Sequence, residues 1–203
     1  MGNTLSTSSN DLLNSLDLTD TCGLDEVENI GNDLLTRSLI TKDTRSKRLL
    51  VTKLFTVQPA DKTKVMELME RLNSVNKMIQ TNSTGLLNFV TRKAGKSGNI
   101  LILQRQYLPY NLADRIITAP FFSEHEKTFL SYQIINSVNA LHSMGCVHGD
   151  IKPENILLTS SNTPYLSDFA PYKPFYIPDD NPYDLNFFFN RSTCLAPERY
   201  KEQ

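Results

Sequence analysis

The chain has 203 residues, a length typical of one or two ordinary domains. Its 21 basic and 22 acidic side chains leave a formal net charge of −1, which argues against a protein that coats nucleic acid, so no nucleic-acid partner is expected. Three cysteines without C-x-x-C spacing exclude a disulfide framework and a zinc knuckle, and the longest purely apolar run, residues 100–103, is too short to span a bilayer.

The amino terminus carries a candidate lipidation site. M-G-N-T-L-S at 1–6 fits the pattern M-G-x-x-x-[ST] for N-myristoylation of Gly2, and the alternative is a flexible polar tail. One myristoyl group binds membranes only marginally, so a second attachment is required. A basic cluster at 42–48 could contribute, but a solvated hairpin face explains it better, and a partner protein is the better second anchor. No charged leader precedes an apolar stretch, so we expect a cytoplasmic location.

The first half of the chain predicts strands and one helix. Residues 1–22, rich in Ser, Thr, Asn and Asp, predict a tail. Residues 30–57 are strand-like, and Lys53 is set into an apolar, partly β-branched run. Apolar residues recur at three- and four-residue steps between 61 and 79, which predicts an amphipathic helix, and 100–106 predicts another strand.

The second half is helical at first and then rich in proline. Ser123 and Glu126 form a capping box at the start of the clearest helix, and Gly145 ends it. Short strands are expected at 156–158 and 165–166. The predicted apolar side of the helix consists of Phe129, Tyr132, Ile135, Val138 and Leu141. Strands followed by helices favour an α+β, two-lobed arrangement.

Three motifs carry the chemistry. H-G-D-I-K-P-E-N at 148–155 is followed by D-F-A at 168–170 and A-P-E at 196–198. In this order and behind a capped helix they resemble the signatures H-R-D-x-x-x-x-N, D-F-G and A-P-E of the protein-kinase family. The resemblance implies a protein-kinase-like fold with an N-lobe at 23–106 and a C-lobe at 107–203 that is truncated just after A-P-E.

The resemblance also assigns roles to individual residues. Phosphoryl transfer depends on positioning and charge neutralisation. Asp150 would accept the proton of the attacking hydroxyl, and Lys152 would lie near the transferring phosphate. Asn155 and Asp168 would hold Mg²⁺ through hard oxygen ligands. Lys53 matches the lysine that pairs with the nucleotide phosphates; the alternative is a solvent-facing position on an edge strand.

Two further parts of the nucleotide site are less directly specified. Glu67 and Glu70 both lie off the apolar stripe of the predicted helix, so helical geometry does not choose between them as the partner of Lys53. Gln106 and Tyr107 fall at the family's hinge, which meets the base by backbone contacts.

The sequence departs from the family pattern at three places. Gly31 is the only glycine between 28 and 40, where the family has a Gly-rich phosphate loop. The choice of base is therefore open, with ATP expected and GTP as the alternative. Gly149 replaces the Arg that reads activation-loop phosphorylation in many kinases. Ala170 replaces the Gly of D-F-G, and the following Pro171 favours an extended, stiff segment.

These departures resemble one branch of the family. M-G-N, R-L-N-S at 71–74, H-G-D, D-F-A and the segment that starts K-P-F-Y-I-P-D-D at 173 are similar to the vacuolar-protein-sorting regulatory subunits of class III phosphatidylinositol 3-kinase. In that branch the R-L-N-S register favours Glu67 as the partner of Lys53. The resemblance implies a myristoylated serine/threonine-kinase-like protein, acting on protein substrates, that anchors the lipid kinase catalytic subunit and its complex on endosomal, vacuolar and autophagic membranes.

Two readings of the activity remain open at this point. The first is ATP-dependent transfer to protein Ser or Thr, supported by the presence of Lys53, Asp150, Asn155 and Asp168. The second is a catalytically weak pseudokinase scaffold that binds nucleotide and restrains the lipid kinase, supported by the sparse glycines and the proline-rich segment. Because kinase domains of this family extend well past A-P-E, we expect residues 1–203 by themselves to be neither stable nor active.

Overall fold

The computed structural model describes residues 17–32, 36–56, 62–82, 85–94, 100–169, 177–178 and 200–201. Gly2, Ala170 and the A-P-E motif therefore lie outside the described residues. The chain divides into two compact units, Met1–Asn76 with Asn88–Tyr107, and Lys77–Leu87 with Leu108–Gln203. The division after Tyr107 falls one residue from the predicted lobe boundary, and Lys77–Leu87 groups with the second unit.

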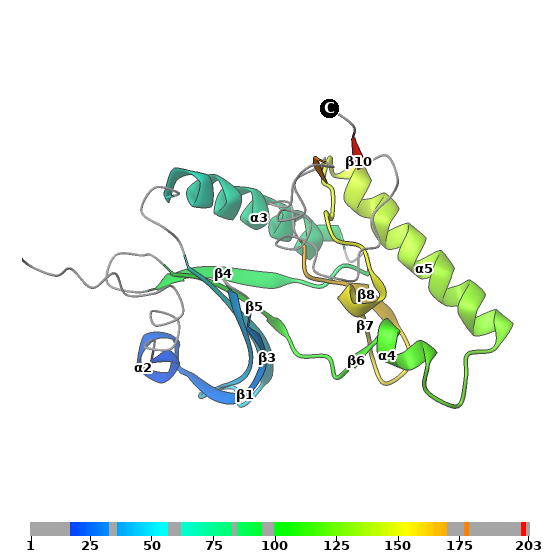
Figure 1. The fold of residues 1–203 in the computed structure, drawn as a ribbon, viewed down its shortest axis with the longest axis horizontal. Helices are drawn as coiled ribbons and strands as arrows, with labels where there is room; N and C mark the ends of the chain where they lie inside the picture. The colour runs from blue at the N-terminus through cyan, green and yellow to red at the C-terminus, as the bar shows by residue number, and fades with distance from the viewer. Residues whose placement is uncertain are drawn as a thin grey trace, which may run out of the picture. The chain divides into compact units, whose positions relative to one another are not determined.

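An antiparallel five-stranded sheet forms the first unit (Figure 1). Its strand order is β1-β2-β3-β5-β4, where the bounds are β1 (Leu24–Asn32), β2 (Thr36–Asp43), β3 (Leu49–Thr56), β4 (Phe89–Ala94) and β5 (Ile100–Gln106). β3 pairs with β2 on one side and β5 on the other, so it is a central strand. The strand-like stretch predicted at 30–57 is thus three strands, and the strand predicted at 100–106 is confirmed.

A short helix, α2 (Leu18–Cys22), packs on this sheet. Asp17 caps it by accepting hydrogen bonds from the Thr19 and Asp20 amides, and Gly23 ends it with a φ of 67°. Leu18 is buried in a core cluster whose other members are Leu24, Leu39, Leu54, Ile100 and Ile102. The last residues of the segment predicted as a tail therefore belong to the first unit, because a single helical turn is too short to show periodicity.

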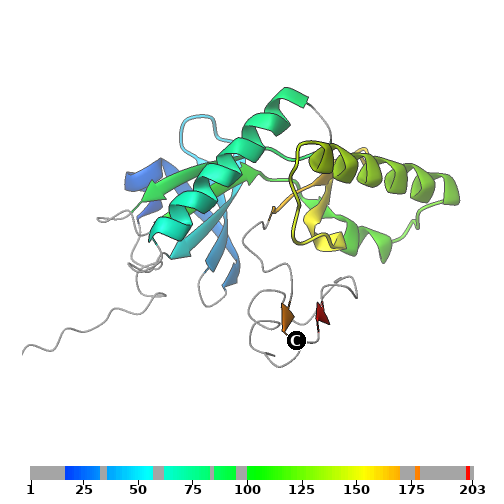
Figure 2. The same cartoon turned by 90° about the horizontal axis from the view of Figure 1, so that it is seen from above.

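The longer helix α3 (Lys62–Asn82) begins in the first unit and ends in the second. Its first part lies on the side of the sheet opposite to α2 and runs across the strands (Figures 1 and 2). Two asparagines of α3 hold β4: Asn76 Oδ1 accepts from the Phe89 amide at 3.0 Å, and Asn73 Oδ1 accepts from Thr91 Oγ1 at 2.6 Å. The helix predicted at 61–79 is confirmed.

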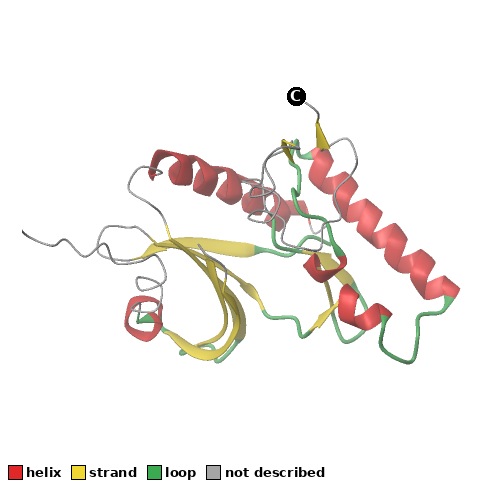
Figure 3. Cartoon of the chain, in the orientation of Figure 1, coloured by secondary structure: helices red, strands yellow, loops and turns green. Residues whose placement is uncertain are grey.

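The second unit is mainly helical among its described residues (Figure 3). It contains α4 (Leu112–Ile116), α5 (Glu124–Ser143), the 3₁₀ turn η2 (Pro153–Asn155), a small sheet of order β6-β7-β8, and the parallel pair β9 (Ile177–Pro178) and β10 (Tyr200–Lys201). The small sheet consists of β6 (Tyr110–Asn111), β7 (Ile156–Leu158) and β8 (Pro164–Leu166). Phe122, Leu130 and Leu158 pack together here. None of the described helices is both long and apolar enough to cross a membrane.

Helix α5 begins and ends as predicted but buries a different face. Ser123 and Glu126 form the capping box, and Gly145 follows the C-cap with a φ of 70°. The predicted apolar side is wrong for three of its five residues, because Phe129, Tyr132 and Ile135 are exposed. The buried residues are Leu130, Ser137 and Leu141. Apolar residues lie on more than one face of this helix, so periodicity alone could not identify the buried one.

Candidate active site

The loop after α5 is organised by His148. This side chain is 1% exposed, and its ring lies 4.9 Å from the Phe169 ring between centroids. Nδ1 accepts from the Asp150 amide at 3.2 Å, so Nε2 carries the proton and donates to the Ser167 carbonyl at 2.7 Å. With both nitrogens engaged in hydrogen bonds, the imidazole is a structural link between the two motifs and not a base.

Asp150, Lys152 and Asn155 meet in one cluster. The Asn155 side-chain amide donates to the Asp150 carbonyl at 2.7 Å and to its carboxylate Oδ2 at 3.1 Å. Lys152 Nζ lies 3.4 Å from the same Oδ2. The turn η2 makes this possible, since it folds Asn155 back toward Asp150 and buries it. Two donors on one carboxylate fix its orientation.

Asp168 is connected to this cluster through its neighbour. The amide and hydroxyl of Ser167 both donate to the Asn155 carbonyl, at 2.9 and 3.1 Å. Asp168 itself has a φ of 61°, a left-handed conformation that is uncommon for residues other than glycine and persists where the surroundings impose it. The structure therefore joins the H-G-D and D-F-A motifs through Asn155 and Ser167.

The oxygen donors present here fit a divalent cation such as Mg²⁺. The side-chain NH₂ group of Asn155 donates to Asp150. The side-chain oxygen Oδ1 of Asn155 is therefore the atom that it can offer to a metal. Asp168 supplies a carboxylate, and Mg²⁺ typically takes one or two protein oxygens and completes its octahedron with water and phosphate oxygens. Among the described residues no group of three or more His, Cys, Asp or Glu could hold a metal by itself.

In the first unit, Lys53 lies in the middle of the sheet. It pairs with Ser38 of β2 and Leu103 of β5, and it is half-buried. The alternative that it occupies an edge strand is therefore wrong. Glu67 lies in α3, but its side chain is outside the described residues, so the Lys53–Glu67 ion pair stays a prediction.

The predicted hinge residues stand at the end of β5. The Tyr107 amide donates to the Leu49 carbonyl at 3.2 Å, which ties the end of β5 to the start of β3. Arg105 is buried and its Nη1 lies 3.4 Å from the Gln106 carbonyl. Backbone groups at this position are thus held by contacts within the first unit.

The segment expected to replace the Gly-rich loop is the end of β1 and the start of β2. The register of β1 shifts between Glu26 and Glu28 and again between Asn29 and Gly31. Asn29 Oδ1 accepts from the Gly31 amide at 3.1 Å, and Arg37 pairs with Glu26 at 2.7 Å. A Cβ added to Gly31 would meet nothing within 4 Å, so this glycine is not required by local packing.

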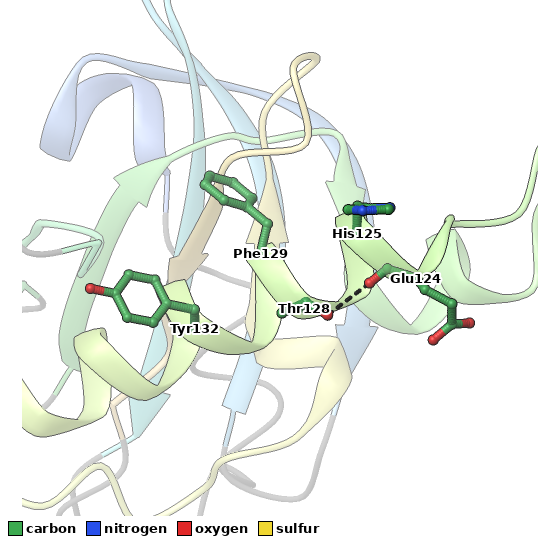
Figure 4. A pocket seen from close by; sticks show the side chains of 5 residues that line it. All are labelled: Glu124, His125, Thr128, Phe129 and Tyr132. Atoms are coloured by element: carbon green, nitrogen blue, oxygen red, sulfur yellow. Dashed lines mark hydrogen bonds between the residues drawn. The ribbon is translucent and has the colours of Figure 1, made fainter.

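The hollow on α5 is separate from these residues. It measures about 450 Å³ and is lined by Glu124, His125, Thr128, Phe129 and Tyr132 (Figure 4). All five side chains project from one helix, and none belongs to the predicted site.

Cys146, at the start of the loop, is half-buried, and burial raises the pKa of its thiol, which favours the unreactive protonated form.

Ser167 is the residue of this cluster that the sequence did not predict. It is fully buried and contacts both His148 and Asn155. Its position directly before D-F-A was the available signal, but a lone serine has no pattern that distinguishes it from a surface residue.

Comparison with known proteins agrees with the motifs. The model of the family described as protein kinase domain matches residues 25–202. A probable serine/threonine-protein kinase vps15 from Dictyostelium discoideum is 51% identical over 104 residues, which is 49% of this chain and 5% of the relative. The serine/threonine-protein kinase VPS15 of Arabidopsis thaliana is 51% identical over 104 residues, 49% of this chain and 7% of the relative. A non-specific serine/threonine protein kinase from Candida glabrata is 36% identical over 156 residues, 74% of this chain and 11% of the relative.

The chain thus spans 5 to 11% of the length of these three relatives. The resemblance inferred from the motifs, including the branch, is confirmed by these matches. Since the family match covers most of the residues and the H-G-D and D-F-A motifs converge on Asn155, this chain belongs to the protein kinase domain family.

Proposed function

We propose that the chain is the kinase region of a serine/threonine protein kinase that transfers the γ-phosphoryl group of ATP to protein hydroxyls. The observation that carries this proposal is the cluster in which Asn155 and Lys152 both contact the Asp150 carboxylate. A carboxylate held in this way accepts a proton from a hydroxyl at a fixed position, which is the role that phosphoryl transfer requires of a protein base.

The remaining roles follow from residue chemistry and the family. Asn155 and Asp168 would hold Mg²⁺, which neutralises charge on the phosphates when bound. Lys53 would pair with the phosphates and Glu67 with Lys53. The backbone of Gln106 and Tyr107 would orient the base. GTP stays the alternative nucleotide, because only Gly31 supplies a glycine near the β1–β2 connection.

The names of the relatives support a finer proposal. VPS15 relatives are named as serine/threonine kinases, and the sequence resembles regulatory subunits of class III phosphatidylinositol 3-kinase. We propose that the chain anchors and regulates that lipid kinase on endosomal, vacuolar and autophagic membranes, with a myristoyl group on Gly2 as one attachment. Replacing Gly2 by Ala and measuring the mass of the N-terminal peptide tests the attachment directly.

A pseudokinase scaffold is the second candidate function. Gly149 and Ala170 stand where many kinases have Arg and Gly, and the latter position is followed by proline. These residues favour a fixed activation segment over a switchable one. In this case the Asp150 cluster would serve nucleotide binding and folding rather than turnover.

The Asp150→Asn variant, made in the full-length protein, separates the two candidates. Asn is nearly isosteric and keeps an acceptor for the Asn155 amide, but it cannot take a proton. Glu154→Gln is the matched control, since Glu154 is an exposed carboxylate in the same turn η2. Phosphate transfer to protein, membrane recruitment and lipid kinase output are measured for each variant.

The kinase proposal expects Asp150→Asn to lose phosphate transfer by a factor of about 10² or more while Glu154→Gln retains it. Unchanged transfer in Asp150→Asn would overturn the catalytic role of Asp150. Loss of transfer with recruitment and lipid kinase output intact would favour the scaffold as the main contribution.

A further inference from the structure

We propose that Gly85 is a positioning residue for Asp168, and that its lack of a side chain keeps the strand before Asp168 in place against α5. This inference rests on the proposed function of Asp168 as a Mg²⁺ ligand. Its basis is the contact of Gly85–Leu87 with β8 and α5, all within the second unit.

The segment 85–87 is joined to β8 by two backbone hydrogen bonds. The Leu166 amide donates to the Gly85 carbonyl at 2.9 Å, and the Leu87 amide donates to the Leu166 carbonyl at 2.9 Å. Leu86 and Leu166 form a parallel bridge between these bonds. Leu86, Leu87 and Leu166 are all buried, so water does not replace these bonds at low cost.

Leu166 is two residues before Asp168, and the residue between them is equally constrained. Ser167 is 0% exposed, and its amide and carbonyl bond to Asn155 and His148. Because hydrogen bonds hold the backbone of Ser167 on both sides, a displacement of Leu166 also displaces Asp168. The left-handed φ of Asp168 depends on the same surroundings.

Gly85 is required by both conformation and space. Its φ is 68°, which favours glycine. A Cβ at this position would overlap with Ser137 Oγ and lie 3.7 Å from the Pro164 carbonyl oxygen. The Ser137 side chain cannot easily move away, because it is 3% exposed and its Oγ donates to the Gln133 carbonyl within α5 at 2.9 Å. An added methyl group therefore pushes the 85–87 segment and, through its hydrogen bonds, β8.

The structure supplies matched variants that separate these effects. Gly85→Ala introduces both the strained φ and the clash. Gly145→Ala introduces the same kind of strain at a φ of 70° with nothing within 4 Å of the new Cβ. In Gly85→Ala with Ser137→Ala the clash is removed, because the nearest remaining atoms are the residue 137 Cβ at 3.6 Å and the Pro164 oxygen at 3.7 Å.

The experiment measures binding of fluorescent ATP to the full-length protein, first in EDTA and then across a Mg²⁺ titration. Gly85→Ala is expected to weaken the Mg²⁺ affinity of the nucleotide complex by about tenfold, the usual size of an outer-shell effect at a metal. Its affinity for fluorescent ATP in EDTA, without metal, should stay unchanged. The double variant restores most of the affinity, and Gly145→Ala keeps it. Equal Mg²⁺ affinity in Gly85→Ala and Gly145→Ala would overturn the proposal.

Two further arms keep the result interpretable. Asp168→Asn tests the proposed Mg²⁺ ligand itself: if it leaves the Mg²⁺ dependence intact, the proposed function of Asp168 fails, whatever Gly85 does. If Gly85→Ala does not fold, Ser137→Val approaches the same contact from α5. A folded Ser137→Val with wild-type Mg²⁺ affinity would overturn the positioning role. Weaker Mg²⁺ affinity, with nucleotide binding in EDTA unchanged, would support it.

Discussion

The side-chain amide of Asn155 donates to both the backbone carbonyl and the carboxylate of Asp150, at 2.7 and 3.1 Å. One residue thus fixes both the position and the orientation of the proposed base. The same residue accepts the Ser167 amide through its own carbonyl, so it also determines where the D-F-A motif begins. Substitutions at this position are expected to affect folding and chemistry together.

Replacing Asn155 by Asp is expected to destabilise the protein by about 1–3 kcal/mol at neutral pH, because a buried donor is lost and two carboxylates face each other. Lowering the pH protonates one of the pair and restores a donor, so the difference from wild type should shrink in acid. Urea unfolding of both proteins at neutral and acidic pH measures this. Asn139→Asp on the exposed face of α5 is the control, and a difference from wild type that does not vary with pH would contradict the account.

Thr41 and Thr52 form a hydroxyl pair inside the first unit. Both are 0% exposed and their Oγ1 atoms are 2.8 Å apart. Thr41→Val alone leaves the Thr52 hydroxyl buried without this partner, and a loss of about 1–3 kcal/mol is expected. The Thr41→Val, Thr52→Val double variant should recover most of that loss, since both polar groups are gone. Additive losses in chemical denaturation would show that the two hydroxyls do not interact.

Two glycines of the first unit should respond differently to Ala. Gly31 has an ordinary φ and open space around it, so Gly31→Ala should leave the unfolding free energy within about 0.5 kcal/mol of wild type. Gly23 has a φ of 67° and Thr44 Oγ1 would lie 3.3 Å from its Cβ, so Gly23→Ala should cost about 1–2 kcal/mol. If Gly31→Ala weakens ATP binding without changing stability, close approach of the backbone to phosphate is its function. Equal ATP affinity would remove Gly31 from the site.

The capping box of α5 predicts a pH dependence. Hydrogen bonds from the Ser123 amide and then its hydroxyl lower the pKa of Glu126. The stabilisation from this lowered pKa is present above the ordinary carboxyl pKa of 4.5 and is lost as the pH falls through the lower folded-state value. Wild type should therefore exceed Glu126→Gln in thermal stability above that pH and approach it below. A constant gap in melting temperature across the same range would contradict this. Ser123→Ala, which removes the cap, should cost about 1 kcal/mol.

Local patterns in the sequence predicted several elements correctly. The capping box at Ser123, the terminal Gly145 and the apolar run at 100–106 are properties of neighbouring residues, so their structures form largely without reference to distant segments. The resemblance of H-G-D and D-F-A to kinase motifs assigned Asp150, Lys152 and Asn155 to one site, and the short turn η2 brings these three side chains together.

The tertiary structure decided what depends on burial by remote parts of the chain. Which face of α5 is covered, why Leu18 belongs to a core, and why Ser167 lies between His148 and Asn155 all follow from contacts between residues far apart in sequence. Gly85 is the clearest case. Besides its φ of 68°, the contact with Ser137, 52 positions away, excludes a side chain there, and no local pattern predicts that contact. The sequence determined which groups are proposed for the chemistry, and packing between distant segments determined which residues hold those groups in position.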